Sequence, residues 1–240
     1  MLAVQAILFY YQKNNDYRLP FAQKGHKGIN RIKKIKMKKL IILLFNALLI
    51  CGIWSCGNNA KRIKHVEFIQ SSSTPATSEL KEGDIVFQTS TSQQAPLIIA
   101  ATNSPWSHCG VIIEKPDGLY VLEAISKVSL TPYQQWVERG VGKRVEAKRY
   151  SQDPIKIKYS KYLGKSYDFA FKFNNGKWYC SELVYDIYKR QLGVELCEPR
   201  PVSDYSLNGL DKQLSKRNID KNQLVVAPSD LHDSKLLANL

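Results

Sequence analysis

The sequence predicts an α+β domain with an antiparallel sheet packed against helices, and three observations support this fold class. Runs rich in β-branched residues, separated by turn signals, occupy the part of the chain between residues 85 and 149. A stretch with apolar residues at three- and four-residue spacing follows later, over residues 181–192. Strands in the first half of the domain and a main helix later in the chain favour an α+β domain with an antiparallel sheet.

The expected strands are short and each is bounded by turn residues. Gly83-Asp84 forms a turn before the strand 85–87. The segments 108–113 and 119–124 flank Lys115-Pro116-Asp117-Gly118, whose proline, aspartate and glycine favour a tight turn. These two segments therefore predict a β-hairpin. A further strand is expected over residues 145–149.

Helices are expected at three places in the domain. Residues 95–101 are apolar and long enough for a short helix, and a second helix is expected over residues 132–139. The third covers residues 181–192, where Leu183, Val184, Ile187 and Tyr188 recur at helical spacing. Gly193 follows at the position of a helix C-cap.

The composition fits a globular protein and excludes several other classes. The chain has 240 residues, of which 44% are hydrophobic and 23% are charged, and these values exclude a wholly disordered chain, a collagen-like fibre and a polytopic membrane protein. The net charge of +14 would suit a nucleic-acid partner. Much of that charge lies in the first 39 residues, however, and no nucleic-acid-binding motif accompanies it. We therefore expect no nucleic-acid partner.

The N-terminal region predicts a lipoprotein signal. Lys38-Lys39 precede an apolar run over residues 40–53, which is too short to span a bilayer comfortably and is typical of a secretory signal peptide. Ile53-Trp54-Ser55-Cys56 resembles a bacterial lipobox, which implies a lipid on the Cys56 sulfur and cleavage before it. The expected location is the cell envelope, lipid-anchored on the periplasmic side of a membrane. An uncleaved N-terminal anchor helix is the alternative.

The chain divides into four parts on this interpretation. Met37 stands directly before the Lys-Lys pair, so residues 1–36 are interpreted as an upstream extension from a misassigned start, with a genuine cytoplasmic segment as the alternative. Residues 37–55 form the signal peptide and residues 56–78 a polar Ser/Thr/Pro-rich tether. Residues 79–240 are then the folded domain, which is long enough for one core.

His108 and Glu123 lie on the two strands of the predicted hairpin. If the turn pairs Lys115 with Gly118, or Pro116 with Leu119, the two side chains point to the same face of the sheet. Glu123 would then be one cross-strand step from His108 and able to orient its imidazole. A three-residue loop would reverse this parity.

The cysteines predict a reactive thiol. Cys51 and Cys56 belong to the signal region, which leaves Cys109, Cys180 and Cys197, an odd number for an oxidising compartment. Cys180 falls in the first turn of the helix expected over residues 181–192, where free N–H groups and the helix dipole favour a thiolate. The spacing of Cys and His residues indicates no zinc site, and no metal or cofactor is expected. A buried structural Cys180 and an ordinary strand-end His108 are the alternative interpretation.

Five sequence blocks occur in an order that resembles one family over residues 79–235. They are Gly83-Asp84-Ile85-Val86-Phe87, His108-Cys109-Gly110-Val111, Leu122-Glu123-Ala124, Gly164-Lys165-Ser166-Tyr167-Asp168 and Tyr179-Cys180-Ser181-Glu182-Leu183. The blocks resemble those of the NlpC-type papain-like cysteine peptidases, but in rotated order. The His block comes before the Cys block, and this order is similar to that of the circularly permuted, YiiX-like amidases. The resemblance implies a permuted papain-like fold with the nucleophile at a helix N-terminus.

The resemblance also implies the site residues. Cys180 would be the nucleophile, His108 the general base and Glu123 the residue that orients it, with Tyr167 and Tyr179 as substrate-binding pocket walls. Tyr179 stands where the unpermuted pattern has Asp, as is usual in the permuted branch. Cys109 stands where an apolar residue is usual, and we expect it to point away from His108 into the core.

The function that follows is hydrolysis of a small amide or peptide through an acyl-enzyme. The compartment would suit peptidoglycan-type amides, although no residue selects that substrate. Chemistry on acyl lipids, by a hydrolase or an acyltransferase, is a second hypothesis. A catalytically silent binding module of the envelope is a third, and the sequence does not indicate an oligomeric state.

Overall fold

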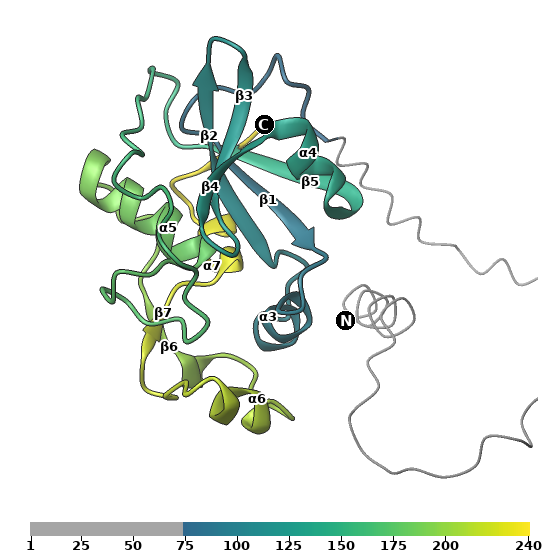
Figure 1. The fold of residues 1–240 in the computed structure, drawn as a ribbon, viewed down its shortest axis with the longest axis vertical. Helices are drawn as coiled ribbons and strands as arrows, with labels where there is room; N and C mark the ends of the chain where they lie inside the picture. The colour runs from purple at the N-terminus through teal and green to yellow at the C-terminus, as the bar shows by residue number, and fades with distance from the viewer. Residues whose placement is uncertain (1–73) are drawn as a thin grey trace, which may run out of the picture. The chain divides into compact units, whose positions relative to one another are not determined.

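The structure is a computed structural model that describes residues 74–240 (Figure 1). The predicted extension over residues 1–36, the signal peptide over residues 37–55, the lipid-accepting Cys56 and most of the tether lie outside the described residues. Within the described part, no helix has both the length and the apolar character needed to cross a bilayer.

One antiparallel sheet forms the centre of the domain and confirms the predicted fold class. Its six strands run in the order β4-β3-β2-β1-β5-β8, and every neighbouring pair is antiparallel. The strands are β1 (Ile85–Ser90), β2 (His108–Lys115), β3 (Gly118–Ala124), β4 (Val128–Pro132), β5 (Gly140–Arg149) and β8 (Ala238–Asn239). A separate two-stranded ribbon joins β6 (Arg200–Pro201) to β7 (Leu224–Val225).

The described residues also form short α-helices. They are α3 (Ala95–Thr102), α4 (Tyr133–Glu138), α5 (Cys180–Ile187), α6 (Asp211–Lys216) and α7 (Pro228–His232). The helix expected over residues 181–192 is α5 followed by one π-helical segment, Tyr188–Leu192, and it ends at Gly193 in the left-handed conformation with φ of 68°. A 3-10 turn covers Val202–Asp204.

The two faces of the sheet carry different cores. Alternation along the strands sends Phe87, Cys109 and Val111 to one face, where they pack against α5 and α7. Ile112 lies on the other face with Trp136 of α4. Figure 1 shows α4 and α5 on opposite sides of the sheet, as this division requires.

The β2–β3 hairpin has one of the two registers under which the sequence places His108 and Glu123 on the same face. Lys115 pairs with Gly118 and Val111 pairs with Leu122, so the loop contains two residues. This register brings His108 and Glu123 to the same face of the sheet, at the end of the hairpin that lies away from the turn.

Candidate active site

Cys180 is the first residue of α5, as the sequence predicted. The chain enters the helix from Tyr179, whose backbone is extended with φ of −100° and ψ of 165°. Cys180 is buried, with 2% of its surface exposed. The N–H groups of a first helical turn have no partner within the helix, so they favour a negative charge at this position.

His108 connects Cys180 with Glu123. Its Nε2 lies 2.6 Å from Oε2 of Glu123, and both residues are buried. Burial disfavours the charged imidazolium, but hydrogen bonds with Cys180 and Glu123, and the negative charges of both groups, raise the pKa of His108 to about 10. The imidazole is therefore held in its protonated form at neutral pH.

Glu123 is fully buried and accepts hydrogen bonds from four side chains. Besides His108, the donors are Oγ1 of Thr131 at 2.5 Å, Nε1 of Trp136 at 3.0 Å and Nη2 of Arg139. Burial opposes ionisation of the carboxyl group, but the bond to His108 and the neighbouring positive charges lower its pKa to about 2. Glu123 is therefore a carboxylate throughout the physiological pH range.

The surroundings of Cys180 favour its thiolate. The largest influence is a hydrogen bond from the Cys109 thiol, and the hydrogen bond and charge of His108 act in the same direction. These contacts outweigh the cost of burial and hold the pKa of Cys180 well below its usual range. With the raised pKa of His108, this favours a thiolate–imidazolium pair.

Cys109 points into the core, as expected, but it does more than fill space. Its side chain is fully buried on the face of the sheet that packs against α5, in the same cluster as Cys180. Burial and the neighbouring Cys180 raise the pKa of the Cys109 thiol. The thiols of Cys109, Cys180 and Cys197 are all free within the described residues.

An apolar pocket opens beside Cys180, between α3, the start of α5 and the segment from Val202 to Pro228. Its walls are Leu97, Ile98, Ala101, Thr102, Phe171, Tyr179, Cys180, Ser181, Val202, Tyr205, Leu207, Leu210, Leu214, Ile219, Val225, Val226, Ala227 and Pro228. The hydroxyls in these walls are already bonded within the protein. Thr102 donates to Ile98, Ser181 donates to Val226, Tyr179 accepts from the Val226 N–H and Tyr205 donates to Asp230. The pocket therefore offers a ligand an apolar surface.

The two tyrosines that the sequence singled out have different places. Tyr179 lines the apolar pocket, in contact with Phe171 at a ring-centroid distance of 5.4 Å. Tyr167 is buried, and burial together with the charge of Cys180 raises its pKa. It lies near Cys180 but is not among the residues that line the pocket.

Three partners of Glu123 were not predicted from the sequence. Thr131 lies on β4, and Glu123 pairs with Ser129 of that strand, so Thr131 shares the face of Glu123. Recognising β4 as a strand would have identified it. Trp136 and Arg139 lie in and directly after α4, and nothing in their spacing indicates that they meet a carboxylate.

No metal site accompanies this arrangement within the described residues. No group of three or more His, Cys, Asp or Glu side chains between residues 74 and 240 could hold an ion. The groups that meet at the site are the thiol of Cys180, the imidazole of His108 and the carboxylate of Glu123.

Comparisons with known proteins agree with this fold. A family model described as a permuted papain-like amidase enzyme, YaeF/YiiX, C92 family, matches residues 79–240. The chain is 33% identical over 170 residues to the uncharacterized protein YiiX of Escherichia coli K12. This match covers 66% of this chain and 84% of YiiX. A crystal structure described as metalloprotein YiiX from Escherichia coli O157:H7 has a TM-score of 0.62 and 31% identity, and the match covers 67% of this chain and 96% of that one.

Proposed function

Because the chain belongs to the permuted papain-like amidase family of YaeF and YiiX, and is a cysteine peptidase or amidase-type hydrolase, we propose that it cleaves amide bonds through a Cys180–His108–Glu123 triad. The observation that carries this proposal is the position of the buried His108, whose Nε2 lies 2.6 Å from Glu123 and which lowers the pKa of the Cys180 thiol at the start of α5. The three groups thus have the contacts that a nucleophile, a general base and an orienting carboxylate need.

The proposed reaction begins with attack of the Cys180 thiolate on the carbonyl carbon. As the C–S bond forms, the carbonyl π electrons move to oxygen, and the backbone N–H groups at the start of α5 stabilise this oxyanion. The imidazolium of His108 donates its proton to the leaving amine while the C–N bond breaks. An acyl-enzyme and the free amine result.

Hydrolysis of the acyl-enzyme uses the same groups in reverse. Neutral His108 takes a proton from water, and the resulting hydroxide attacks the acyl carbon. Collapse of the second oxyanion breaks the C–S bond and releases the acid and the Cys180 thiolate. Glu123 stabilises the imidazolium in both steps and keeps its ring in one orientation.

The cell envelope is the proposed location, with small amides or peptides of the peptidoglycan type as substrates. The lipobox-like Ile53-Trp54-Ser55-Cys56 supports the location, and the location supports this substrate class. Cys56 would carry the lipid that attaches the domain to the membrane.

A second candidate function, hydrolysis or transfer of lipid acyl groups, is favoured by the pocket beside Cys180. Its walls are apolar and its hydroxyls are bonded within the protein, so a hydrocarbon chain would fit there better than a polar peptide side chain. An amide, a thioester and an ester would all suit the same thiolate chemistry.

The dependence of kcat/KM on acyl length tests which function holds. For N-acyl amides of increasing chain length, burial of each methylene is worth about 0.8 kcal/mol, or roughly fourfold in kcat/KM. A steep rise would support acyl substrates, and Ala101→Trp, which fills the pocket, should flatten it. If peptide amides are hydrolysed and kcat/KM for the N-acyl amides does not change with acyl length, the peptidase function gains support. If no amide, ester or thioester is turned over, both enzyme functions fail and the silent binding module gains support.

The related crystal structure is described as a metalloprotein. Residues 74–240 of this chain hold no group of three or more His, Cys, Asp or Glu side chains with the arrangement that an ion needs. No step of the proposed mechanism is therefore assigned to a metal.

A further inference from the structure

Arg217 lies next to residues that line the apolar pocket. It directly follows α6, between Leu214 and Ile219, which both line the pocket. Its Nη1 donates a hydrogen bond of 3.3 Å to Oε1 of Gln94, and its Cζ lies 6.0 Å from the centre of the Phe171 ring. Phe171 is itself a pocket wall. The guanidinium is therefore next to the space that a substrate would enter.

Arg217 differs from every other arginine in the described part of the chain. Residues 74–240 contain six arginines, and the other five form ion pairs with carboxylates: Arg139, Arg144, Arg149, Arg190 and Arg200. Arg217 is half-buried and has no carboxylate partner among the described residues. A guanidinium has five N–H donors, and the bond to the neutral Gln94 uses one of them.

The charge of Arg217 acts on Tyr167, a buried tyrosine near Cys180. Burial and the negative charge of Cys180 raise the pKa of Tyr167, whereas the positive charge of Arg217 lowers it. Both groups therefore act on the same buried phenol.

Two surfaces would recognise different parts of a substrate: the apolar pocket and the Arg217 guanidinium. The pocket is apolar and could not stabilise a negative charge, while the guanidinium beside the pocket wall Phe171 presents free donors in a planar fork that matches carboxylate and phosphate. We propose that Arg217 is a specificity-determining residue that binds an anionic group, a carboxylate or a phosphate, on a substrate whose apolar part enters the pocket. The substrate class is thus an anionic amphiphile, an inference that rests on the proposed function.

Binding to a full-length chain with Cys180→Ala tests the inference without turnover. The first ligand pair is N-decanoylglycine and its neutral analogue N-decanoylglycinamide. The second is N-decanoylethanolamine phosphate and neutral N-decanoylethanolamine. We expect the anion of at least one pair to bind about tenfold or more tightly than its neutral partner in calorimetry, as one charge-assisted hydrogen bond implies. The ratio compared is the Kd of the neutral compound divided by the Kd of the anion. The pair with the larger ratio shows whether Arg217 prefers a carboxylate or a phosphate.

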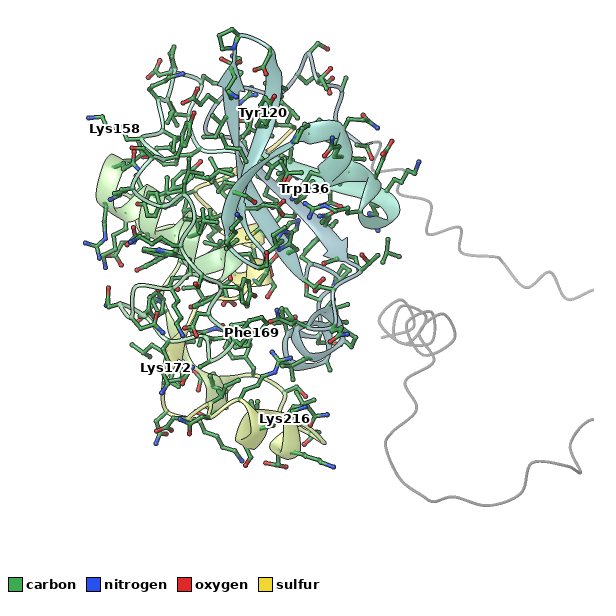
Figure 2. The ribbon with its side chains drawn as sticks, viewed as in Figure 1. Tyr120, Trp136, Lys158, Phe169, Lys172 and Lys216 are labelled. Carbon is green, nitrogen blue, oxygen red and sulfur yellow. The ribbon has the colours of Figure 1, made fainter. Side chains whose placement is uncertain are left out.

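Three further substitutions, each combined with Cys180→Ala, assign that preference to Arg217. Arg217→Gln should bring the ratio close to one. Arg217→Lys should keep part of it, because the charge remains and the fork is lost. Lys216→Gln is the matched control: it removes the same charge from the exposed neighbouring position on α6, labelled in Figure 2, and should leave the ratio unchanged. If Arg217→Gln does not fold, the reduced ratio of Arg217→Lys takes its place.

Several results would overturn the inference. They are equal binding within both pairs, no binding of any of the four compounds, an equal loss for anion and neutral analogue in Arg217→Gln, and a loss of the ratio in Lys216→Gln. Failure of the proposed function gives a different pattern. The wild-type chain would then leave N-decanoylglycine intact, while the Cys180→Ala chain would still prefer the anion in an Arg217-dependent way.

Discussion

Glu123 is the residue on which the geometry of the site depends most. Its carboxylate accepts bonds from His108, Thr131, Trp136 and Arg139, and these donors come from β2, β4, α4 and the residue that follows α4. A buried carboxylate without such donors would be protonated and could not stabilise an imidazolium. The network therefore preserves the charge that His108 needs.

Glu123→Gln keeps the size of this side chain and removes its charge. We expect kcat/KM to fall by about tenfold to a hundredfold, less than for His108→Ala, because each charge-assisted bond is worth about 1.5–3 kcal/mol. Steady-state hydrolysis of an N-acyl amide by the three proteins checks this order. Wild-type activity in Glu123→Gln would show that the carboxylate does not act on His108.

The pH dependence of unfolding gives a second measure of Glu123. Its pKa is lowered to about 2 in the folded protein, against about 4.3 in an unfolded chain. The stability from this shift is present above about pH 4.3 and is lost as the pH falls through 2. In urea titrations, the stability difference between wild type and Glu123→Gln should therefore shrink between about pH 5 and pH 2, and a constant difference would contradict the pKa shift.

At the scale of elements, the β2–β3 hairpin sets the distance between His108 and Glu123. Gly110 lies between them, where a Cβ atom would meet Cγ1 of Val121 at 2.4 Å and the carbonyl oxygen of Leu122 at 2.8 Å. The carbonyl belongs to the backbone and cannot turn away. The close approach of the two strands therefore requires glycine at this position.

Gly110→Ala should separate the two strands at the site. We expect a loss of stability of about 1–3 kcal/mol, as in other overpacked cores, and a fall in activity larger than the stability loss explains. Urea unfolding and kcat/KM measured on the same samples would check both. Ser129→Ala, at a half-buried position of β4 that faces Glu123 across the ladder, is a control that adds no atoms. Normal activity in Gly110→Ala would show that the hairpin tolerates the extra atom and that its spacing is not critical.

The hairpin also shows how far the sequence predicts this structure. Two β-branched runs around Pro116-Asp117-Gly118 indicate both strands but leave the length of the loop open. The observed two-residue loop gives the register that brings His108 to Glu123. The strand β4 was not predicted, because it is short and ends at Pro132. The helices α6 and α7, of six and five residues, are too short to show a helical period.

The site could be predicted only where it depends on local sequence patterns. Local patterns placed Cys180 at a helix start and sent Cys109 into the core. They could not show that α5 packs on the face that holds Cys109, since that contact joins residues 71 positions apart in the chain. The partners of Glu123 on α4 and the position of Arg217 depend on tertiary packing in the same way.

At the scale of the whole molecule, the predicted anchor would decide which substrates the domain meets. The polar tether over residues 56–78 would let a lipid-anchored domain stay near the membrane surface while it remains free to turn. That position would suit both peptidoglycan-type amides and amphiphilic substrates. The anchor lies outside the described residues, so its test must come from the protein in cells.

Cys56→Ala should abolish lipidation, because the thiol accepts the lipid on this interpretation. Metabolic labelling with an alkynyl fatty acid should mark the wild type but not the mutant, whose signal should also stay uncleaved. Cys51→Ala, five residues earlier in the same region, is the matched control and should label normally. A chain that begins at Met37 should be exported and labelled like the full sequence. Labelling of Cys56→Ala at the wild-type level would contradict the lipobox interpretation.

The central claim is that Cys180 is a thiolate paired with His108, and the rate of alkylation as a function of pH tests it most directly. Iodoacetamide would be applied to the full chain between pH 4 and 10, and mass spectrometry would follow Cys109, Cys180 and Cys197 separately. Cys180 should react well below the pKa of a free thiol, about 8.5. Its profile should move to higher pH in His108→Ala, whereas Cys109 and Cys197, whose pKa values are raised, should react slowly at pH 6. A Cys180 that titrates like a free thiol, or one joined to Cys109 in a disulfide, would contradict the account.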